Sequence, residues 1–178
     1  MTLPPLTSSG AVLSPCDQHR YFLWRVWDEY KPPTIFIMLN PSTANAKDDD
    51  ATIRKCMSYA HKWGAGGINI LNLFSYRTKS PKVLVEAAKK GIAVIGPEND
   101  GTIRRLLEES PQAICGWGNL PTGLKPSQIL THLYVGGPKS AQLMCLGTNL
   151  DGSPKHPLYL RGDLQPVPFD LFRETGRK

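Results

Sequence analysis

Three polar side chains with chemical potential stand at the ends of apolar segments that are far apart along the chain. Asn40 follows one apolar run, Asn72 interrupts a second, and His156 lies in a loop after the last one. A side-chain amide offers a donor and an acceptor together and can pair with the edge of a nucleobase. Plainer readings exist for each residue: an Asx turn at Asn40, a satisfied core amide at Asn72 and a surface histidine at His156.

Three consecutive aspartates precede the segment ATIRKCMSYAHKWG, whose apolar residues recur at helical spacing. Acidic residues are favoured at a helix N-terminus, so all three have a structural explanation. Asp50 is the best placed to cap the helix, which leaves Asp48 or Asp49 freer to act as a general base. We take Asp49 as the candidate.

Strands and helices alternate along the chain. Strands are expected at 34–39, 68–74, 113–118 and 141–147, with an edge strand or hairpin at 19–30 and a short strand or loop at 92–96. Helices are expected at 50–64, 80–91, 99–110 and 126–134. Alternation predicts an α/β fold, here a three-layer sandwich around a mainly parallel sheet of about four to five strands, with a ligand site beyond the carboxyl ends. Residues 1–18 are expected to be a flexible arm and 19–178 a single domain.

Composition narrows the partners. The chain has 178 residues, a formal charge of +6 and a sequence pI of about 9.2, which favours a polyanion such as nucleic acid. It has no apolar run near the roughly 20 residues that cross a bilayer and no leader peptide, so we expect a cytoplasmic monomer. The four cysteines are scattered without zinc or redox spacing, so we expect neither a metal nor a cofactor.

Four short blocks, in this order, resemble the uracil-DNA glycosylase superfamily: IFIMLNPS, INILNLFSYR, AICGWGN and HPLYL. The resemblance implies that Asn72 reads the edge of a pyrimidine and that His156 stabilises the leaving base. It also implies that Leu160 wedges into the duplex when the nucleotide is drawn out of the stack. DNA is then favoured over RNA as the partner.

The same resemblance assigns the remaining roles. Asn40 or an acid near it, for which Asp49 is our candidate, would place the attacking water, while Pro41, Ser42, Gly118 and Phe74 would surround or stack on the base. Arg77, Lys79 and Arg161 would hold phosphates. The resembled enzymes mostly carry Asp where this chain has Asn40, which implies a slow or altered reaction, and the small Ser42 implies a pocket that tolerates modified pyrimidines.

The chain as a whole is more similar still to an uncharacterised family, domain of unknown function 1643. The blocks MLNPSTANAKDDDATIRKC, WGAGGINILNLFSYR, GPEND and KHPLYL carry this resemblance, from about Arg20 to Leu160. Within GPEND, Asn99 either caps the next helix or contacts a ligand particular to the family.

The sequence therefore predicts a glycosylase-like protein that binds a flipped-out, modified or mismatched pyrimidine and hydrolyses its N-glycosidic bond. A non-catalytic reader of modified bases remains an alternative, because Asn40 cannot act as a base. A hydrolase or transferase of free nucleosides or nucleotides is the other alternative.

Overall fold

Four strands built from the apolar runs pair in parallel at the centre of the sheet. β3 (Pro33–Met38) pairs with β4 (Gly67–Asn72) on one side and with β5 (Gln112–Cys115) on the other, and β5 pairs with β6 (Gln142–Cys145). Continuous apolar sequence suits these strands because both faces of the sheet are covered. The structure is a computed structural model and describes residues 3–42, 48–122, 124 and 141–171.

The chain has the predicted α/β fold, but its sheet is mixed and larger than the predicted four to five mainly parallel strands. Over the described residues it has seven strands in the order β1-β2-β4-β3-β5-β6-β7. β1 (Ser8–Leu13), β2 (Arg20–Val26) and β7 (Val167–Pro168) join through antiparallel pairings. β2 is an inner strand, since it lies between β1 and β4. Antiparallel strands need no crossover helix and tolerate polar residues, so the strand–helix alternation does not reveal them.

β1 lies inside the segment 1–18 that the sequence predicts as a flexible arm, and this corrects the prediction for residues 8–13. The hairpin with β2 is closed by the ring of Trp24, which lies across Gly10. A Cβ atom on Gly10 would stand 2.1 Å from Trp24 Cζ2, so only glycine fits under the ring. Trp24 Nε1 also donates a hydrogen bond to Ser8 Oγ at 3.2 Å.

Three α-helices are described, and each was predicted. They are α1 (Ala51–Lys62), α2 (Pro81–Lys89) and α3 (Asn99–Glu108), and a short 3₁₀ helix, η1, spans Pro157–Tyr159. Residues 92–96 form a loop, and the predicted helix at 126–134 falls outside the described residues. In the described part of the chain, no helix has the length and apolar character to cross a membrane.

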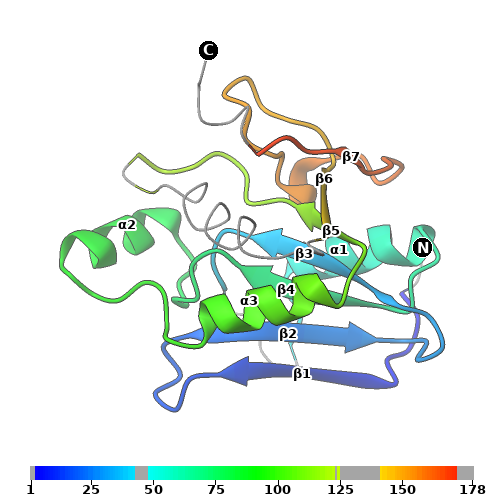
Figure 1. Cartoon of the computed structure of the whole chain (residues 1–178), viewed down its shortest axis with the longest axis horizontal. Helices are drawn as coiled ribbons and strands as arrows, with labels where there is room; N and C mark the ends of the chain where they lie inside the picture. Colours follow the sequence, from blue (N-terminus) through cyan, green and yellow to red (C-terminus); the bar gives the residue numbers. More distant parts are fainter. Residues whose placement is uncertain (1–2, 43–47, 123, 125–140, 172–178) are drawn as a thin grey trace.

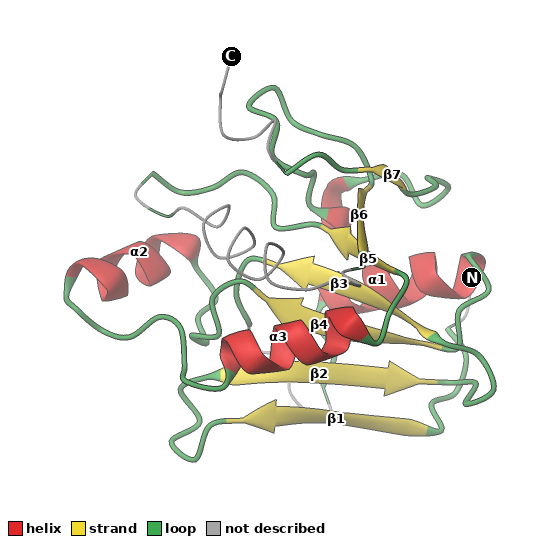
Figure 2. Cartoon of the chain, in the orientation of Figure 1, coloured by secondary structure: helices red, strands yellow, loops and turns green. Residues whose placement is uncertain are grey.

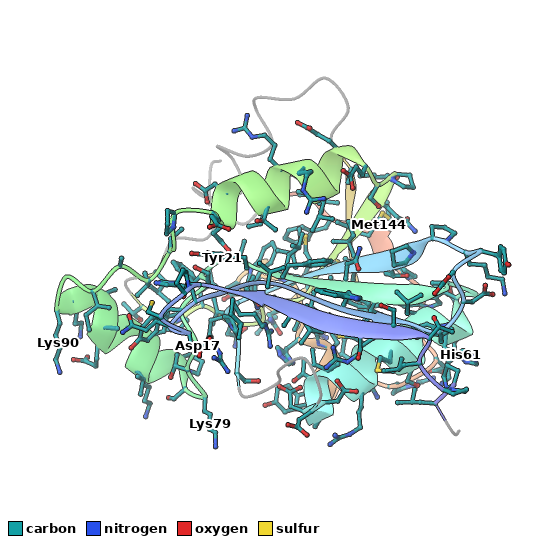
Figure 3. The ribbon with its side chains drawn as sticks, turned by 90° about the horizontal axis from the view of Figure 1, so that it is seen from below. Asp17, Tyr21, His61, Lys79, Lys90 and Met144 are labelled. Carbon is teal, nitrogen blue, oxygen red and sulfur yellow. The ribbon has the colours of Figure 1, made fainter. Side chains whose placement is uncertain are left out.

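Helices cover both faces of the sheet, with α1 on one face and α3 on the other (Figures 2 and 3). Alternate residues of the central strands supply the two cores. Phe36 and Ile70 pack with the apolar side of α1, whereas Ile37 and Leu71 pack with α2 and α3. Period-two alternation therefore decides which helix each strand residue meets.

The order of the parallel strands creates a crevice. From β3 the chain runs through α1 to β4 on one side, and later returns through β5 on the other side of β3. Loops that leave β3 and β5 in opposite directions separate at the carboxyl ends, where open α/β sheets bind ligands. α2 lies beyond these ends (Figure 1).

Candidate functional site

A cavity of about 330 Å³ opens at the carboxyl ends of β3, β4 and β5. Its walls come from these strand ends, the first residues of β2 and α1, the loop before α2, and the loop that enters η1. The lining residues are Arg20, Met38, Leu39, Asn40, Ser42, Asp50, Thr52, Ile53, Ile70, Asn72, Lys79, Pro81, Trp117, Gly118, Asn119, His156, Leu158 and Tyr159. The three polar residues singled out first, Asn40, Asn72 and His156, all line it.

Asn40 is half-buried and ties the end of β3 to the loop before α2. Its Nδ2 donates to the carbonyl oxygens of Thr78, at 2.8 Å, and Pro41, at 3.1 Å. Thr78 N–H in turn donates to the Pro41 carbonyl at 2.9 Å. Two carbonyl acceptors require that the nitrogen of the amide faces them. Oδ1 is therefore the atom that Asn40 can offer to a water molecule or a ligand.

Asn72 ends β4 and is only 2% exposed. Its Oδ1 accepts a hydrogen bond from Nη2 of Arg20 at 3.3 Å. A guanidinium has donors and no acceptor, so this contact settles which end of the amide is oxygen. Nδ2 is the end of the amide that remains for a ligand in the cavity.

Arg20, the first residue of β2, places a buried charge at the cavity wall. The residue is 2% exposed, and burial lowers the pKa of its guanidinium to about 10, a shift that the Asp50 carboxylate opposes. The group therefore stays charged at neutral pH. Sequence reasoning missed Arg20; the available signal was an arginine at the start of the aromatic run RYFLW.

His156 is held against the glycine turn that follows β5. A Cβ atom on Gly116 would lie 2.9 Å from Pro157 Cδ, and one on Gly118, where φ is +76°, would lie 3.3 Å from His156 Cβ. Both glycines thus make room for the His-Pro segment. Gly118, a predicted site residue, lines the cavity, whereas Gly116 does not and meets the Pro157 ring.

The His156 ring has a defined tautomer. Its Nδ1 accepts a hydrogen bond from Leu158 N–H at 3.3 Å, so in the neutral ring the proton is on Nε2. Burial lowers the pKa of His156, and the nearby Asp50 carboxylate partly opposes this shift. At neutral pH the ring is consequently a neutral N–H donor at the cavity.

Asp50, and not Asp49, is the carboxylate of the cavity. Asp50 caps α1 as predicted, with Oδ1 accepting from Ile53 N–H at 2.9 Å, while Ser42 Oγ donates to Oδ2 in a short hydrogen bond. Asp49 instead forms an ion pair with the buried Arg25 of β2, at 2.8 Å. Asp50 therefore caps the helix and lines the cavity at once, so capping does not by itself remove a carboxylate from the site.

Three other predicted base-binding residues lie behind the cavity wall. Phe74 is 5% exposed and belongs to the core under α2 and α3, because β4 ends at Asn72 and the chain bends before Phe74. Asn99 is fully buried, and its Nδ2 donates to the carbonyls of Asn72 and Leu73 at the end of β4. Pro41 is buried and offers its carbonyl to Thr78. These residues position the strand ends without lining the cavity.

Of the four predicted DNA-binding residues, Lys79 lines the cavity and the other three do not. Lys79 is exposed, lines the rim of the cavity and projects outward before α2 (Figure 3). Arg77 donates to the Asp17 carbonyl at 2.9 Å, and Arg161 pairs with Asp163. Leu160 is half-buried against the α1 core, where a wedge into a duplex is not presented.

The family model described as "Protein of unknown function (DUF1643)" matches residues 20–158, well over half of the chain. The chain belongs to the DUF1643 family. No curated protein and no solved structure matches it. The resemblance to uracil-DNA glycosylases therefore stays a prediction, and its consequences are taken up below as a proposal.

The DUF1643 match begins at Arg20 and ends at Leu158, so it includes nearly the whole cavity. Two aromatic residues of the lining were also missed as site residues. Trp117 is 2% exposed and packs edge-on against Phe169, whereas Tyr159 is 82% exposed on the rim, 5.5 Å from the His156 ring. The pattern Gly-Trp-Gly was a usable signal for Trp117; an exposed tyrosine in a loop gives none.

The DUF1643 chain also holds the loop after His156 in place through α1. Lys62 Nζ and Trp63 Nε1 donate to backbone carbonyls of residues 162 and 164, at 2.6 and 3.1 Å, and Tyr59 donates a short hydrogen bond to the carbonyl of residue 161. Side chains of one helix thereby fix a loop about 100 residues away in sequence.

In the described segments, no group of three or more His, Cys, Asp or Glu side chains is arranged to hold a metal ion.

Proposed function

We propose that this protein binds a single extrahelical pyrimidine of DNA in the cavity and hydrolyses its N-glycosidic bond. The observation that carries the proposal is that Asn40, Asn72 and His156 line one cavity although they lie far apart in the sequence. The glycosylase resemblance requires these three residues to meet at the carboxyl ends of the central strands, here β3, β4 and β5. The helices on both faces of the central parallel strands are consistent with the three-layer sandwich that the resemblance implies.

The cavity suits one nucleobase. Its volume of about 330 Å³ is at the lower end of the range of about 300–1,000 Å³ for small-molecule sites. The apolar part of the lining includes Met38, Ile70 and the buried Trp117, which can pack against a planar ring. Nδ2 of Asn72 supplies a polar contact to the ring edge. A base entering such a site has left the stack, which costs less for a mismatched or damaged base.

The neutral His156 is suited to the leaving group. When the bond between C1′ and N1 breaks, the electron pair remains on the base, and negative charge collects on its ring and oxygens. The Nε2–H of His156 can donate to this charge without itself losing a proton. Preorganised donors of this kind are worth about 10²–10³ in rate.

Asp50 and Asn40 are suited to the opposite end of the reaction. Positive charge develops on the sugar as the bond lengthens, and the Asp50 carboxylate stabilises that charge. Asn40 Oδ1 can accept a hydrogen bond from the attacking water, whose oxygen forms the new bond to C1′ and whose proton passes to Asp50. Ser42, hydrogen-bonded to Asp50, keeps the carboxylate in place.

The rim carries groups for the DNA backbone. Lys79 lies on one side of the cavity mouth, and Lys155 lines an adjoining hollow that shares Gly118 and His156 with the cavity. Tyr159 lines both the cavity and the adjoining hollow and is 82% exposed. We assign Tyr159, in place of the half-buried Leu160, to fill the gap that the extruded nucleotide leaves.

The test is base release. Fluorescent oligonucleotides, single-stranded or in duplexes, each carry one uracil, thymine mismatch or oxidised, methylated or deaminated pyrimidine, and hot alkali converts any abasic site to a strand break. We expect a break with at least one base, and a loss of about 10²–10³ in rate for His156→Gln. The variant, purified identically, also controls for contaminating glycosylases. Absence of breaks with every substrate would reject the enzymatic function.

The non-catalytic reader is the second candidate, and Asn40 favours it. Both amide hydrogens of Asn40 bind backbone carbonyls, which is a structural role, and an amide cannot take a proton from water at neutral pH. Tight, base-dependent binding to one of the same oligonucleotides without a strand break would decide for the reader. Release of base from free nucleosides alone would indicate a nucleoside hydrolase.

A further inference from the structure

The wall of the cavity formed by β2 and β4 presents hydrogen-bond donors side by side. Arg20 at the start of β2 and Asn72 at the end of β4 both line the cavity, and Arg20 Nη2 donates to Asn72 Oδ1 at 3.3 Å. Because that bond turns the oxygen of the amide toward the guanidinium, Asn72 offers Nδ2. Arginine has five N–H groups and no acceptor, so its contribution is also a donor.

The carboxylate oxygens in the lining are already engaged. Asp50 Oδ1 accepts from Ile53 N–H and Oδ2 accepts from Ser42, and both oxygens belong to the start of α1. His156 contributes a further N–H. A ligand edge that meets this part of the cavity therefore encounters donors from three different elements.

We infer that Arg20 and Asn72 together select a base by two neighbouring acceptor atoms, and that Arg20 is a specificity-determining residue of this site. This inference rests on the proposed binding of an extrahelical pyrimidine. Two acceptors side by side occur in the O2 and N3 atoms of neutral cytosine and its derivatives, and in a carboxylate substituent of an oxidised pyrimidine. Uracil and thymine present a donor, N3–H, between two acceptors, and this donor meets the donors of the wall.

The buried charge of Arg20 strengthens the selection. The guanidinium is 2% exposed, where hydrogen bonds from a charged donor are stronger and an unmatched donor is costly. A ring N–H placed against the guanidinium finds no acceptor there, because arginine has none to offer. Matched acceptors, in contrast, are bound by a charged donor and an amide donor at once. A carboxylate gains in addition from the positive charge.

Binding to a chain with a single base tests this inference. The probe is a fluorescein-labelled oligonucleotide of abasic tetrahydrofuran spacers with one central base, which is uracil, cytosine or 5-carboxyuracil, and the all-spacer oligonucleotide is the reference. Fluorescence polarisation gives each Kd. We expect cytosine, 5-carboxyuracil or both to bind at least about tenfold more tightly than uracil, since a good bidentate contact discriminates by about 1–3 kcal/mol. Cytosine alone would identify the ring edge as the ligand, and 5-carboxyuracil alone would identify the substituent.

Two variants assign the effect to residues. Asn72→Asp keeps the contact with Arg20 and replaces the free donor by an acceptor, so the preference should reverse toward uracil. Arg20→Met should reduce the ratio of the affinity for the preferred base to that for uracil by about tenfold or more. Arg104→Met, which removes one exposed charge from α3, is the control and should change none of the ratios.

The failures are distinguishable. If all three bases bind more tightly than the all-spacer oligonucleotide but equally well, or if uracil binds most tightly, the selection by Arg20 and Asn72 is refuted. The proposed function is not affected by that result. Binding of all three no tighter than the all-spacer oligonucleotide overturns the proposed function and this inference with it. If Arg20→Met does not fold, by circular dichroism, the reversal in Asn72→Asp decides: retained preference for cytosine or 5-carboxyuracil would refute the role of the amide.

Discussion

Gly116→Ala tests whether the His-Pro segment depends on the glycine turn after β5. The added Cβ would lie 2.9 Å from Pro157 Cδ, 3.0 Å from Pro157 Cγ and 3.2 Å from Met38 Sδ. The proline ring is rigid, so the loop must move, and overpacking of this kind costs about 1–3 kcal/mol. Since φ at Gly116 is not positive, the cost is steric and not conformational.

The displacement also reaches the cavity. His156 precedes Pro157 and donates from Nε2, and a misplacement of about 1 Å in a catalytic constellation lowers the rate by about 10². We therefore expect Gly116→Ala to lose both stability and base-dependent binding or release. Urea denaturation measures the first, through a lower midpoint at an unchanged slope. Polarisation or alkali cleavage measures the second.

Gly101→Ala is the matched control. Gly101 lies in α3, and a Cβ atom there would meet nothing within 4 Å. Alanine in a helix interior is favoured over glycine by roughly 0.5–1 kcal/mol, so this variant should unfold at higher urea and bind as the wild type does. A midpoint for Gly116→Ala equal to that of the wild type, with binding intact, would refute the packing argument for the His-Pro segment.

Three further outcomes follow from charges in the structure. Burial lowers the pKa of His156 and of His19, so below about pH 6.5 the unfolded chain binds protons that the folded chain does not, and the free energy of unfolding decreases as the pH decreases. His156→Gln should make this decrease smaller, and a pH profile equal to that of the wild type would contradict the prediction. Asp49→Ala removes the carboxylate from the buried Arg25 and should cost about 3 kcal/mol in urea unfolding while base preference is unchanged; a loss of base release without a loss of stability would restore Asp49 to the site. Lys79→Ala should reduce the slope of log K against log salt by about one for any DNA sequence, and an unchanged slope would place the phosphate elsewhere.

Much of the scaffold could be read from local patterns. The apolar runs of β3 and β4, the Asp50 cap of α1 and Pro81 at the start of α2 depend on neighbours within a few residues, and each lies where expected. The sequence did not predict β1, because half of this strand consists of serine and glycine. Its place depends on the Trp24 ring from the next strand, which is a contact no local pattern contains.

The site shows the same division. Residue types and strand-end positions were enough to single out Asn40, Asn72 and His156, because parallel strands bring their carboxyl ends to one edge. They were not enough to choose among the aspartates. Asp49 forms an ion pair with a buried arginine on β2, a strand that pairs with β4, and this contact exists only in the folded chain.

From its order of residues alone, the chain specifies its central strands and helices, and the edge where they end, because periodicity and capping act over short distances. The order of residues does not specify which polar atoms face the cavity. Arg20 turns the amide of Asn72, two glycines admit His156, and α1 holds the loop behind it. Each of these contacts joins segments far apart in sequence, and hydrogen-bond direction and van der Waals distance exist only once the segments have packed.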